Sequence, residues 1–356
     1  MTERQRVKEH DFYEEVMAYT REVRQRSIDG RVVVRAGDLP WLQERQAFVK
    51  YYLWPSRYSG RPPETVLDEW AVFAQRIGTH SGKHRHQGGL AIFALEGEGY
   101  SVVDGVRYEW EAGDLLLLPL KPGGVEHQHF NRQEGKPAKW VAFIHAALYE
   151  WGASELVQLQ EHPDFPRAGS RHPAPGEPGH ALDLIRPQPQ ATLPPAPQAE
   201  NLLEWLYARR DAQRAAADQA PCVVRGRELP WEQNRQGKMR WYLHPAMHDT
   251  AIRSLTVFVQ EIPPGSRTGL QRVPGGSVLF MLRGRGYTLL DGERHDWQAD
   301  DCLNLPIRRD GVSVQHVNPD PTQTAAFVSV DLNLVDVLGV NRGAAFEQLE
   351  SAPDQV

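Results

Sequence analysis

Short apolar runs separated by glycine, proline and aspartate recur along most of the chain, as in LAIFALEGEGYSVVDG from Leu90. Runs of this length, bounded by turn residues at short intervals, predict the β-strands of a sandwich or barrel. Two stretches differ, because residues 11–26 and 200–220 are rich in helix-forming residues, and the second has an apolar stripe at helical spacing. The pattern therefore predicts an all-β architecture with two added helices.

The sequence contains an internal repeat. The segment VVRAGDLPWLQERQAFVKYYLWP from Val33 returns as VVRGRELPWEQNRQGKMRWYLHP from Val223, and GEGYSVVDG from Gly97 returns as GRGYTLLDG from Gly284. The offset between the copies shifts from 190 to 187 residues, as short loop insertions on a common strand frame would cause. The repeat predicts two copies of one structural unit.

We expect two tandem domains, residues 1–160 and 200–356, each opened by one of the predicted helices. Ten of the 27 prolines fall from Pro163 to Pro197, a density that excludes regular structure over most of this stretch. Residues 161–199 are therefore expected to form an extended linker. A strap across a barrel or a subunit contact is the alternative.

Composition and charge narrow the class of protein. The 356 residues carry a net charge of -6 with no long basic block, so we expect no nucleic-acid partner. The two cysteines are too few for a disulfide framework, the start MTERQRVKEHDFYEEV lacks an apolar signal core, and no apolar run approaches the ~20 residues of a membrane span. We expect a cytoplasmic protein without membrane contact.

Histidines crowd one region of the first unit, where six of the 14 lie from His80 to His145. His84 and His86 are two residues apart, so on a strand both rings project from one face. A second apolar run precedes His127 and His129, and a neighbouring strand there would bring a third imidazole to the first two. This spacing predicts a metal site formed by His84, His86 and His127, with surface or core histidines as the alternative.

The order of these features resembles the cupin superfamily. A His-x-His pair, a Gly-x-Gly turn, a Gly-Asp before an apolar strand, Pro119, and a later histidine with an asparagine four residues on all occur in sequence. The resemblance implies a bicupin: two tandem double-stranded β-helix (jelly-roll) barrels, each preceded by a helix. The glutamate that follows His-x-His in most metal-binding cupins is replaced by QGGLA, so the expected ligands are three neutral imidazoles.

The second unit is expected to lack the metal. At the offset of 187, the three ligand positions become Gln271, Val273 and Val314, while the glycines Gly275 and Gly276 keep the turn of the first copy. A barrel with a glutamine and two valines in these places cannot hold an ion in the same way. We therefore expect one metal per chain, in the first barrel.

A bicupin with three histidines in its first barrel is similar to the ring-cleaving dioxygenases that act on gentisate, salicylate or 1-hydroxy-2-naphthoate. The resemblance implies Fe(II), O2 and a small hydroxylated aromatic substrate, and it assigns catalytic roles to His129 and Gln75. His129 would move a proton or hydrogen-bond the substrate, or alternatively support His127. Gln75 recurs as Gln260 in the metal-free copy, which favours a structural amide.

The chain departs from this group at the pocket wall. The place of the arginine that pairs with a substrate carboxylate is Ile92, which shares its strand face with Leu90, and an aspartate of the following strand gives way to His145. Ile92, Leu90 and His145 are therefore the expected substrate-binding residues. A metal-dependent lyase, isomerase or decarboxylase and a non-catalytic small-molecule-binding bicupin remain the alternatives. Bicupins assemble, so we expect a homo-oligomer.

Overall fold

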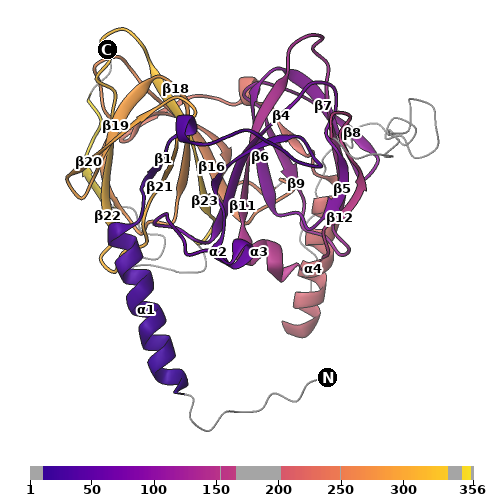
Figure 1. Cartoon of the computed structure of the whole chain (residues 1–356), viewed down its shortest axis with the longest axis horizontal. Helices are drawn as coiled ribbons and strands as arrows, with labels where there is room; N and C mark the ends of the chain where they lie inside the picture. Colours follow the sequence, from indigo (N-terminus) through magenta and orange to yellow (C-terminus); the bar gives the residue numbers. More distant parts are fainter. Residues whose placement is uncertain (1–10, 153, 166–201, 249, 336–346, 354–356) are drawn as a thin grey trace.

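The fold comes from a computed structural model that describes residues 11–152, 154–165, 202–248, 250–335 and 347–353. Two barrels stand side by side, each built from a five-stranded and a seven-stranded antiparallel sheet (Figure 1). The predicted all-β bicupin is thereby confirmed. Most of the predicted linker, residues 161–199, lies outside the described residues, so the linker stays a prediction.

The first barrel closes around the histidine-rich strands. Its five-stranded sheet contains, in spatial order, β12 (Val157–Gln160), β5 (Lys83–His86), β10 (Val125–Asn131), β7 (Glu98–Val103) and β8 (Val106–Glu111). Its seven-stranded sheet contains β13 (Val223–Val224), β9 (Leu115–Leu118), β6 (Leu90–Glu96), β11 (Ala138–His145), β4 (Trp70–Ile77), β3 (Phe48–Leu53) and β2 (Leu42–Gln43).

The second barrel repeats this order with the equivalent strands. Its five-stranded sheet contains β20 (Glu293–Gln298), β19 (Arg285–Leu290), β22 (Val312–Val317), β17 (Leu270–Val273) and β24 (Glu347–Glu350). Its seven-stranded sheet contains β1 (Val33–Val34), β21 (Cys302–Asn304), β18 (Val278–Arg283), β23 (Ala325–Leu332), β16 (Leu255–Ile262), β15 (Gly237–Leu243) and β14 (Glu232–Asn234).

Turn residues fix the strand register in both copies. Asp104 and Gly105 join β7 to β8 with φ of 48° and 77°, and Asp291 and Gly292 join β19 to β20 with φ of 50° and 85°. Positive φ at both central residues is the backbone of the two-residue type I′ hairpin, which Asp-Gly favours. The repeated Asp-Gly pair therefore sets the pairing of these strands, and with it the face of each side chain.

The seven-stranded sheets are buried on both faces, which explains why their strands read as continuous apolar runs. On β6, Ile92 belongs to the core inside the first barrel, whereas Phe93 belongs to the core between the barrels. Phe93 meets Tyr242 of the second unit at a ring centroid distance of 5.6 Å, and Tyr52 meets Phe280 at 5.3 Å. The apolar core between the barrels thus joins the two units, while the first barrel keeps a core of its own.

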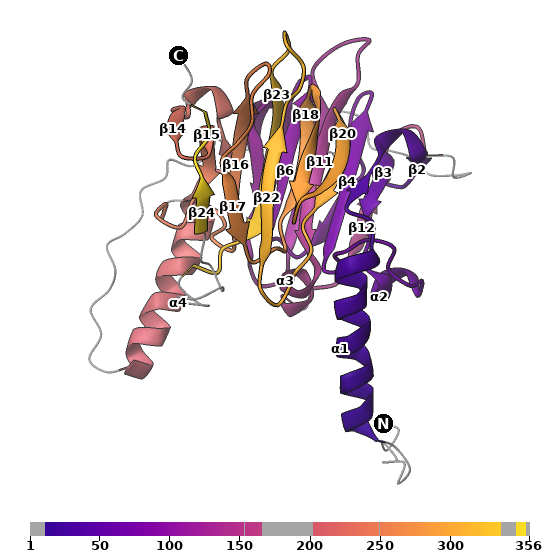
Figure 2. The same cartoon turned by 90° about the vertical axis from the view of Figure 1, so that its left-hand side faces the viewer.

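Each unit also lends a short strand to the other barrel. Strand β1 pairs with β21 of the second barrel (Figure 1), and β13 pairs with β9 of the first. In the view of Figure 2 the strands of the second barrel lie in front of those of the first. Buried carboxylates stabilise the places where the exchanged segments meet the other barrel, here called the junctions. Asp301 accepts a hydrogen bond from the Ala36 amide at 2.9 Å, and Asp114 accepts the equivalent bond from the Gly226 amide at 2.9 Å. The exchange ties both units into one body.

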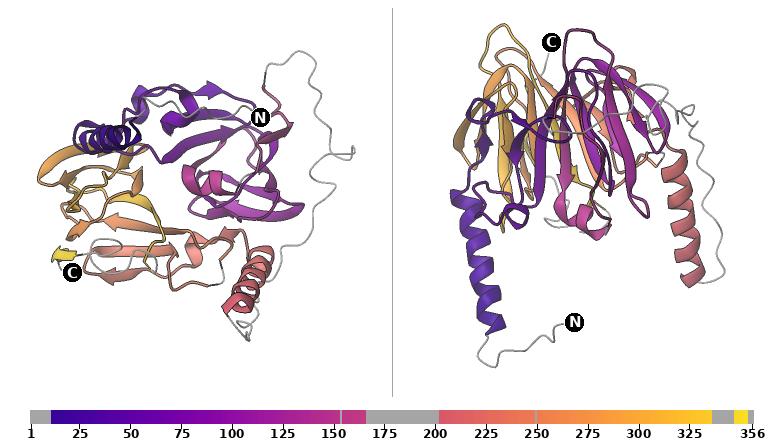
Figure 3. Two further views of the ribbon diagram at one scale, coloured as in Figure 1. Left: turned by 90° about the horizontal axis from the view of Figure 1, so that it is seen from below. Right: turned by 45° about the vertical axis from the view of Figure 1, so that its right-hand side comes forward.

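The two predicted helices project from the same end of this body (Figure 3). They are α1 (Phe12–Asp29) and α4 (Leu202–Gln219), and Asp11 caps α1 by accepting hydrogen bonds from the amides of Tyr13 and Glu14. No described helix is long and apolar enough to cross a membrane. The other helical elements of the described residues are short: α2 (Ser56–Ser59), α3 (Ala146–Trp151) and the 3-10 turns η1 (Ala36–Asp38) and η3 (Gly226–Glu228).

The exchanged strands predict an effect of single substitutions on stability. Asp114→Asn should lower the thermal unfolding midpoint by about 3–6 °C, because an amide nitrogen would face the buried donors Gly226 N–H and Arg225. Asp301→Asn should act equally on the other junction. The exposed Asp296→Asn serves as the control and should shift the midpoint by less than ~1 °C. Equal midpoints for all three variants would show that the buried carboxylates do not hold the exchange.

Candidate metal centre

Three imidazoles converge inside the first barrel, as the sequence predicted. Strands β5 and β10 are antiparallel neighbours in a register that places His127 opposite His84 and Val125 opposite His86. Alternation then directs all three rings to one face of the sheet. One nitrogen from each of His84, His86 and His127 lies within 4.8 Å of the others. The structure therefore assembles a group that could hold a metal ion.

Backbone carbonyls orient two of these rings. The Nδ1 atom of His86 lies 2.7 Å from the Gln87 carbonyl oxygen, and the Nδ1 atom of His127 lies 3.1 Å from the Val125 carbonyl oxygen. A proton on Nδ1 can be donated to each carbonyl, which leaves Nε2 as the free electron pair. The Nε2 atoms of His84 and His127 face one another at 2.6 Å. Both nitrogens thus point to the same spot.

The surroundings keep these imidazoles neutral. Burial lowers the pKa of His84 and His127 well below the usual value of 6.5, with the neighbouring histidines adding to the effect, and burial also lowers the pKa of His86. Protons therefore do not compete for the nitrogens near neutral pH. Three unprotonated nitrogens without a carboxylate suit an imidazole-preferring divalent ion such as Fe(II), Zn, Cu, Mn or Ni.

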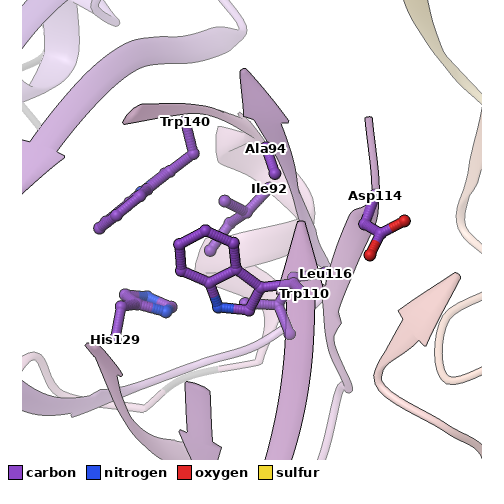
Figure 4. Close-up of a pocket in the computed structure, with 7 residues that line it drawn as sticks. All are labelled: Ile92, Ala94, Trp110, Asp114, Leu116, His129 and Trp140. Carbon is purple, nitrogen blue, oxygen red and sulfur yellow. The ribbon is translucent and has the colours of Figure 1, made fainter. Parts of the chain in front are cut away.

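His129 lies next to His127, farther into the barrel. Its ring centroid is 5.5 Å from that of His127 and 5.0 Å from that of Trp140, and a cavity of about 10 Å³ lies beside it among Trp110, Ile92 and Trp140 (Figure 4). One water needs roughly 10–15 Å³. This cavity can take a water-sized molecule but not an aromatic ring.

Hydrogen bonds fix the orientation of the His129 ring. Its Nδ1 atom lies 2.7 Å from the Ser101 hydroxyl, which also accepts a bond from the Trp110 indole N–H at 3.0 Å. Burial lowers the pKa of His129 to about 3, so the ring is neutral. With the hydroxyl proton donated to Nδ1, the proton of His129 resides on Nε2.

The second barrel repeats this arrangement, although its described residues bring no histidine triad together. The Nδ1 atom of His316 lies 2.8 Å from the Thr288 hydroxyl, and Trp297 donates to the same hydroxyl at 3.0 Å. Burial again lowers the pKa, to about 3 for His316. A histidine, hydroxyl and tryptophan network that persists beside Gln271 and Val314 supports the fold in both copies.

The other predicted site residues lie in different places. Gln75 is buried on β4 and accepts a hydrogen bond from the Trp140 indole at 3.1 Å, so its oxygen is engaged by the barrel wall. Leu90 and Ile92 face the interior, as predicted. His145, which was expected to bind the substrate, does not face the interior, because it shares its face of β11 with Phe143 and packs edge-on against Trp70 at 5.1 Å.

Several neighbours of the triad were not among the predicted residues. Gln158 on β12 lies opposite His84 in the sheet and accepts a hydrogen bond from Gln46 at 2.6 Å. Tyr149 of α3 stands 5.6 Å from the His86 ring. A signal for Gln158 exists in the repeat, since its Gln-Leu dipeptide returns at Gln348 with the offset of 190. No such repeat marks Tyr149.

The second barrel places Gln271 opposite Val314 and Val273 opposite Val312, in the register of the triad. The Gln271 amide donates to Gln348 at 3.2 Å instead of facing an ion. Two valine side chains offer no ligand atom. The three equivalent positions therefore cannot hold a metal as the first barrel can.

Comparison with known proteins gives the same picture. The cupin domain family matches residues 72–144, from β4 to β11. The 5-aminosalicylate 1,2-dioxygenase of a Comamonas species is 25% identical over 282 residues, which is 76% of this chain and 67% of that protein.

Solved structures of oxalate decarboxylase variants from Bacillus subtilis share the fold. A deletion variant superimposes with a TM-score of 0.57 at 13% identity, and a tryptophan-to-phenylalanine variant with 0.57 at 14%; both alignments cover 90% of this chain and 80% of the other. Identity this low supports the fold alone. The chain therefore contains a cupin domain match in its first barrel, together with the histidine triad, and has the two-barrel fold of a bicupin.

Proposed function

We propose that this bicupin is an Fe(II)-dependent dioxygenase that cleaves the ring of a small hydroxylated aromatic molecule with O2. The observation that carries the proposal is the triad of neutral imidazoles without a carboxylate, in a chain similar to 5-aminosalicylate 1,2-dioxygenase. The proposed site lies in the first barrel, with one iron per chain held by His84, His86 and His127.

The charge of the ligand set favours an anionic substrate. Three neutral imidazoles leave the double positive charge of a divalent ion uncompensated, so adjacent oxygen anions of a phenol or carboxylate are the natural partners. When bound there, Fe(II) supplies the Lewis acidity and the electrons that ring cleavage by O2 requires. The protein supplies orientation and a dry surrounding.

The apolar interior sets where an aromatic ring can lie. The cavity beside His129 is water-sized, so the ring must approach from the other side of the triad. In the second barrel, Trp241 and Phe258 line a large cavity, and their equivalents in the first are Tyr51 and Phe73, whose rings are 5.8 Å apart. We propose that the substrate ring rests against Tyr51 and Phe73, with Leu90 and Ile92 closing the wall.

His129 is proposed to act as a neutral hydrogen-bond donor. Its low pKa excludes a resting imidazolium, whereas the Nε2–H left by the Ser101 bond faces the barrel interior. This donor could stabilise negative charge that develops on oxygen during the reaction. Gln75 is proposed to act indirectly, by holding Trp140 at the floor of the site.

Removal of one ligand tests the proposal. Protein purified without added metals should contain about one iron per chain and should consume O2 with at least one of gentisate, salicylate, 5-aminosalicylate or 1-hydroxy-2-naphthoate. His127→Ala should retain less than about a tenth of the iron and lose activity at least ~100-fold, because two imidazoles do not hold the ion. Iron analysis and an oxygen electrode measure both effects.

The chain offers a matched control for this experiment. Val314→Ala truncates the equivalent residue of the second barrel and should change neither iron content nor oxygen uptake. Iron and activity retained in His127→Ala would refute the ligand assignment. Stoichiometric iron with no oxygen uptake on any of the four substrates would instead favour a lyase, isomerase or decarboxylase.

Substitutions at His129 and at its equivalent in the second barrel, His316, distinguish a catalytic role from a structural one. His129→Asn should keep the iron and lower kcat by about 100-fold, as loss of a donor to developing charge does. His316→Asn, the same change in the metal-free barrel, should lower the unfolding midpoint but leave kcat unchanged. If the two variants differ only in stability and both retain full kcat, His129 serves the fold and not the reaction.

The expected homo-oligomer is proposed to use the projecting helices. Both helices present large apolar side chains to solvent: Phe12, Tyr13, Val16 and Tyr19 on α1, and Leu202, Leu203, Trp205 and Leu206 on α4. Contact with a second copy of the chain would remove these side chains from water.

Light scattering tests this assembly. The measured mass should be a multiple of the 40.3 kDa chain mass, and the double substitution Val16→Glu with Leu206→Glu should reduce that mass. A native chain that is monomeric at micromolar concentration contradicts this assembly.

A further inference from the structure

We propose that the second, metal-free barrel is a binding site for a small organic amine, whose apolar ring occupies the barrel while its ammonium group meets Asp331. This site is separate from the proposed iron centre and does not depend on its chemistry. It would give the duplicated barrel a role of its own.

The second barrel encloses a cavity of about 800 Å³. Small-molecule sites in proteins measure roughly 300–1,000 Å³. Inward-facing residues of β16, β17, β18, β22 and β23 line the cavity, and the lost ligand positions Gln271, Val273 and Val314 are among them. The second barrel therefore has a cavity of the size of a small-molecule site, and the positions of the lost metal ligands line it.

The cavity walls suit a ring. Trp241 and Phe258 contact one another at a centroid distance of 5.1 Å, and Phe258 contacts Phe327 at 6.4 Å. Leu279 and Leu305 add aliphatic surface. Aromatic faces also attract cations, so these walls can hold the ring of a positively charged ligand.

The polar groups at one part of the cavity are already paired. Gln236 and Gln271 both donate their amide N–H to the Gln348 side-chain oxygen at 3.2 Å, and Gln260 donates to the Gln236 carbonyl oxygen at 2.6 Å. These amides satisfy each other and need no ligand. The polar anchor of the site must lie elsewhere.

Asp331 is that anchor. It replaces Ile144 of the first barrel at the offset of 187, so a carboxylate stands where the first copy has an apolar side chain. The Ser277 hydroxyl donates to it at 2.6 Å and the Leu332 amide at 2.9 Å, but neither group carries a charge. Burial raises the pKa of Asp331 to about 6, because the negative charge of the carboxylate loses contact with water.

The cationic residues around the cavity do not neutralise this charge. Three arginines line the cavity, Arg235, Arg308 and Arg309, and Arg308 forms an ion pair with Asp291 and donates to the Ser27 carbonyl oxygen. In the described part of the chain no lysine, arginine or histidine forms an ion pair with Asp331. His244 packs its ring against Trp241. A buried carboxylate without a counter-ion is costly, and a bound ammonium would remove that cost.

Calorimetry with the full-length, iron-containing protein tests the site. The probes are benzylamine, 2-phenylethylamine and tryptamine, each compared with the carboxylic acid of matching size. At least one amine should bind, Asp331→Asn should weaken its binding at least 10-fold, and the acids should not compete. Asp331→Asn should leave oxygen uptake unchanged, because the residue lies outside the proposed catalytic site.

Two further variants separate this inference from the proposed function. Leu279→Trp fills the cavity and should abolish amine binding even if Asp331→Asn fails to fold. His127→Ala, which removes a proposed iron ligand, should bind the amine as tightly as the native chain. The inference is overturned if none of the three amines binds, if the acids bind equally well, or if amine binding survives Leu279→Trp or disappears in His127→Ala.

Discussion

The register between β5 and β10 is the constraint on which the candidate site depends. Because His127 lies directly opposite His84 and side chains alternate along each strand, the three imidazoles lie on one face of the sheet and their nitrogens converge. A shift of one residue would turn His127 outward and bring Glu126 or Gln128 inward. The Asp-Gly hairpin, the close packing at Gly88 and the apolar strands of the barrel all contribute to holding that register.

Gly88 shows that the two barrels keep the same backbone although their ligand residues differ. A Cβ atom there would lie 1.8 Å from the Pro119 carbonyl oxygen, and at the equivalent Gly275 it would lie 1.9 Å from that of Pro306. Both barrels therefore require glycine at this crossing. The frame was kept in both copies, while the ligand positions of the second copy became Gln271, Val273 and Val314. One barrel can thus serve the proposed metal chemistry while the other offers an open cavity.

Local patterns were sufficient to predict much of this structure. Turn residues such as Asp104-Gly105 and the His-x-His spacing act over a few residues, so they indicated the β-strands and the triad correctly. The exchange of β1 and β13 between barrels was not predicted, because it depends on contacts such as Ala36 with Asp301, 265 residues apart. The resemblance assigns His145 to the pocket wall, but the alternation of β11 directs it toward Trp70.

Anomalous diffraction at the iron absorption edge, from crystals of protein purified without added metals, tests the central claim most directly. We predict a single strong peak per chain, about 2.1 Å from one nitrogen each of His84, His86 and His127. A peak beside Gln271 and Val314, or a triad whose rings diverge with no ion between them, would contradict the account.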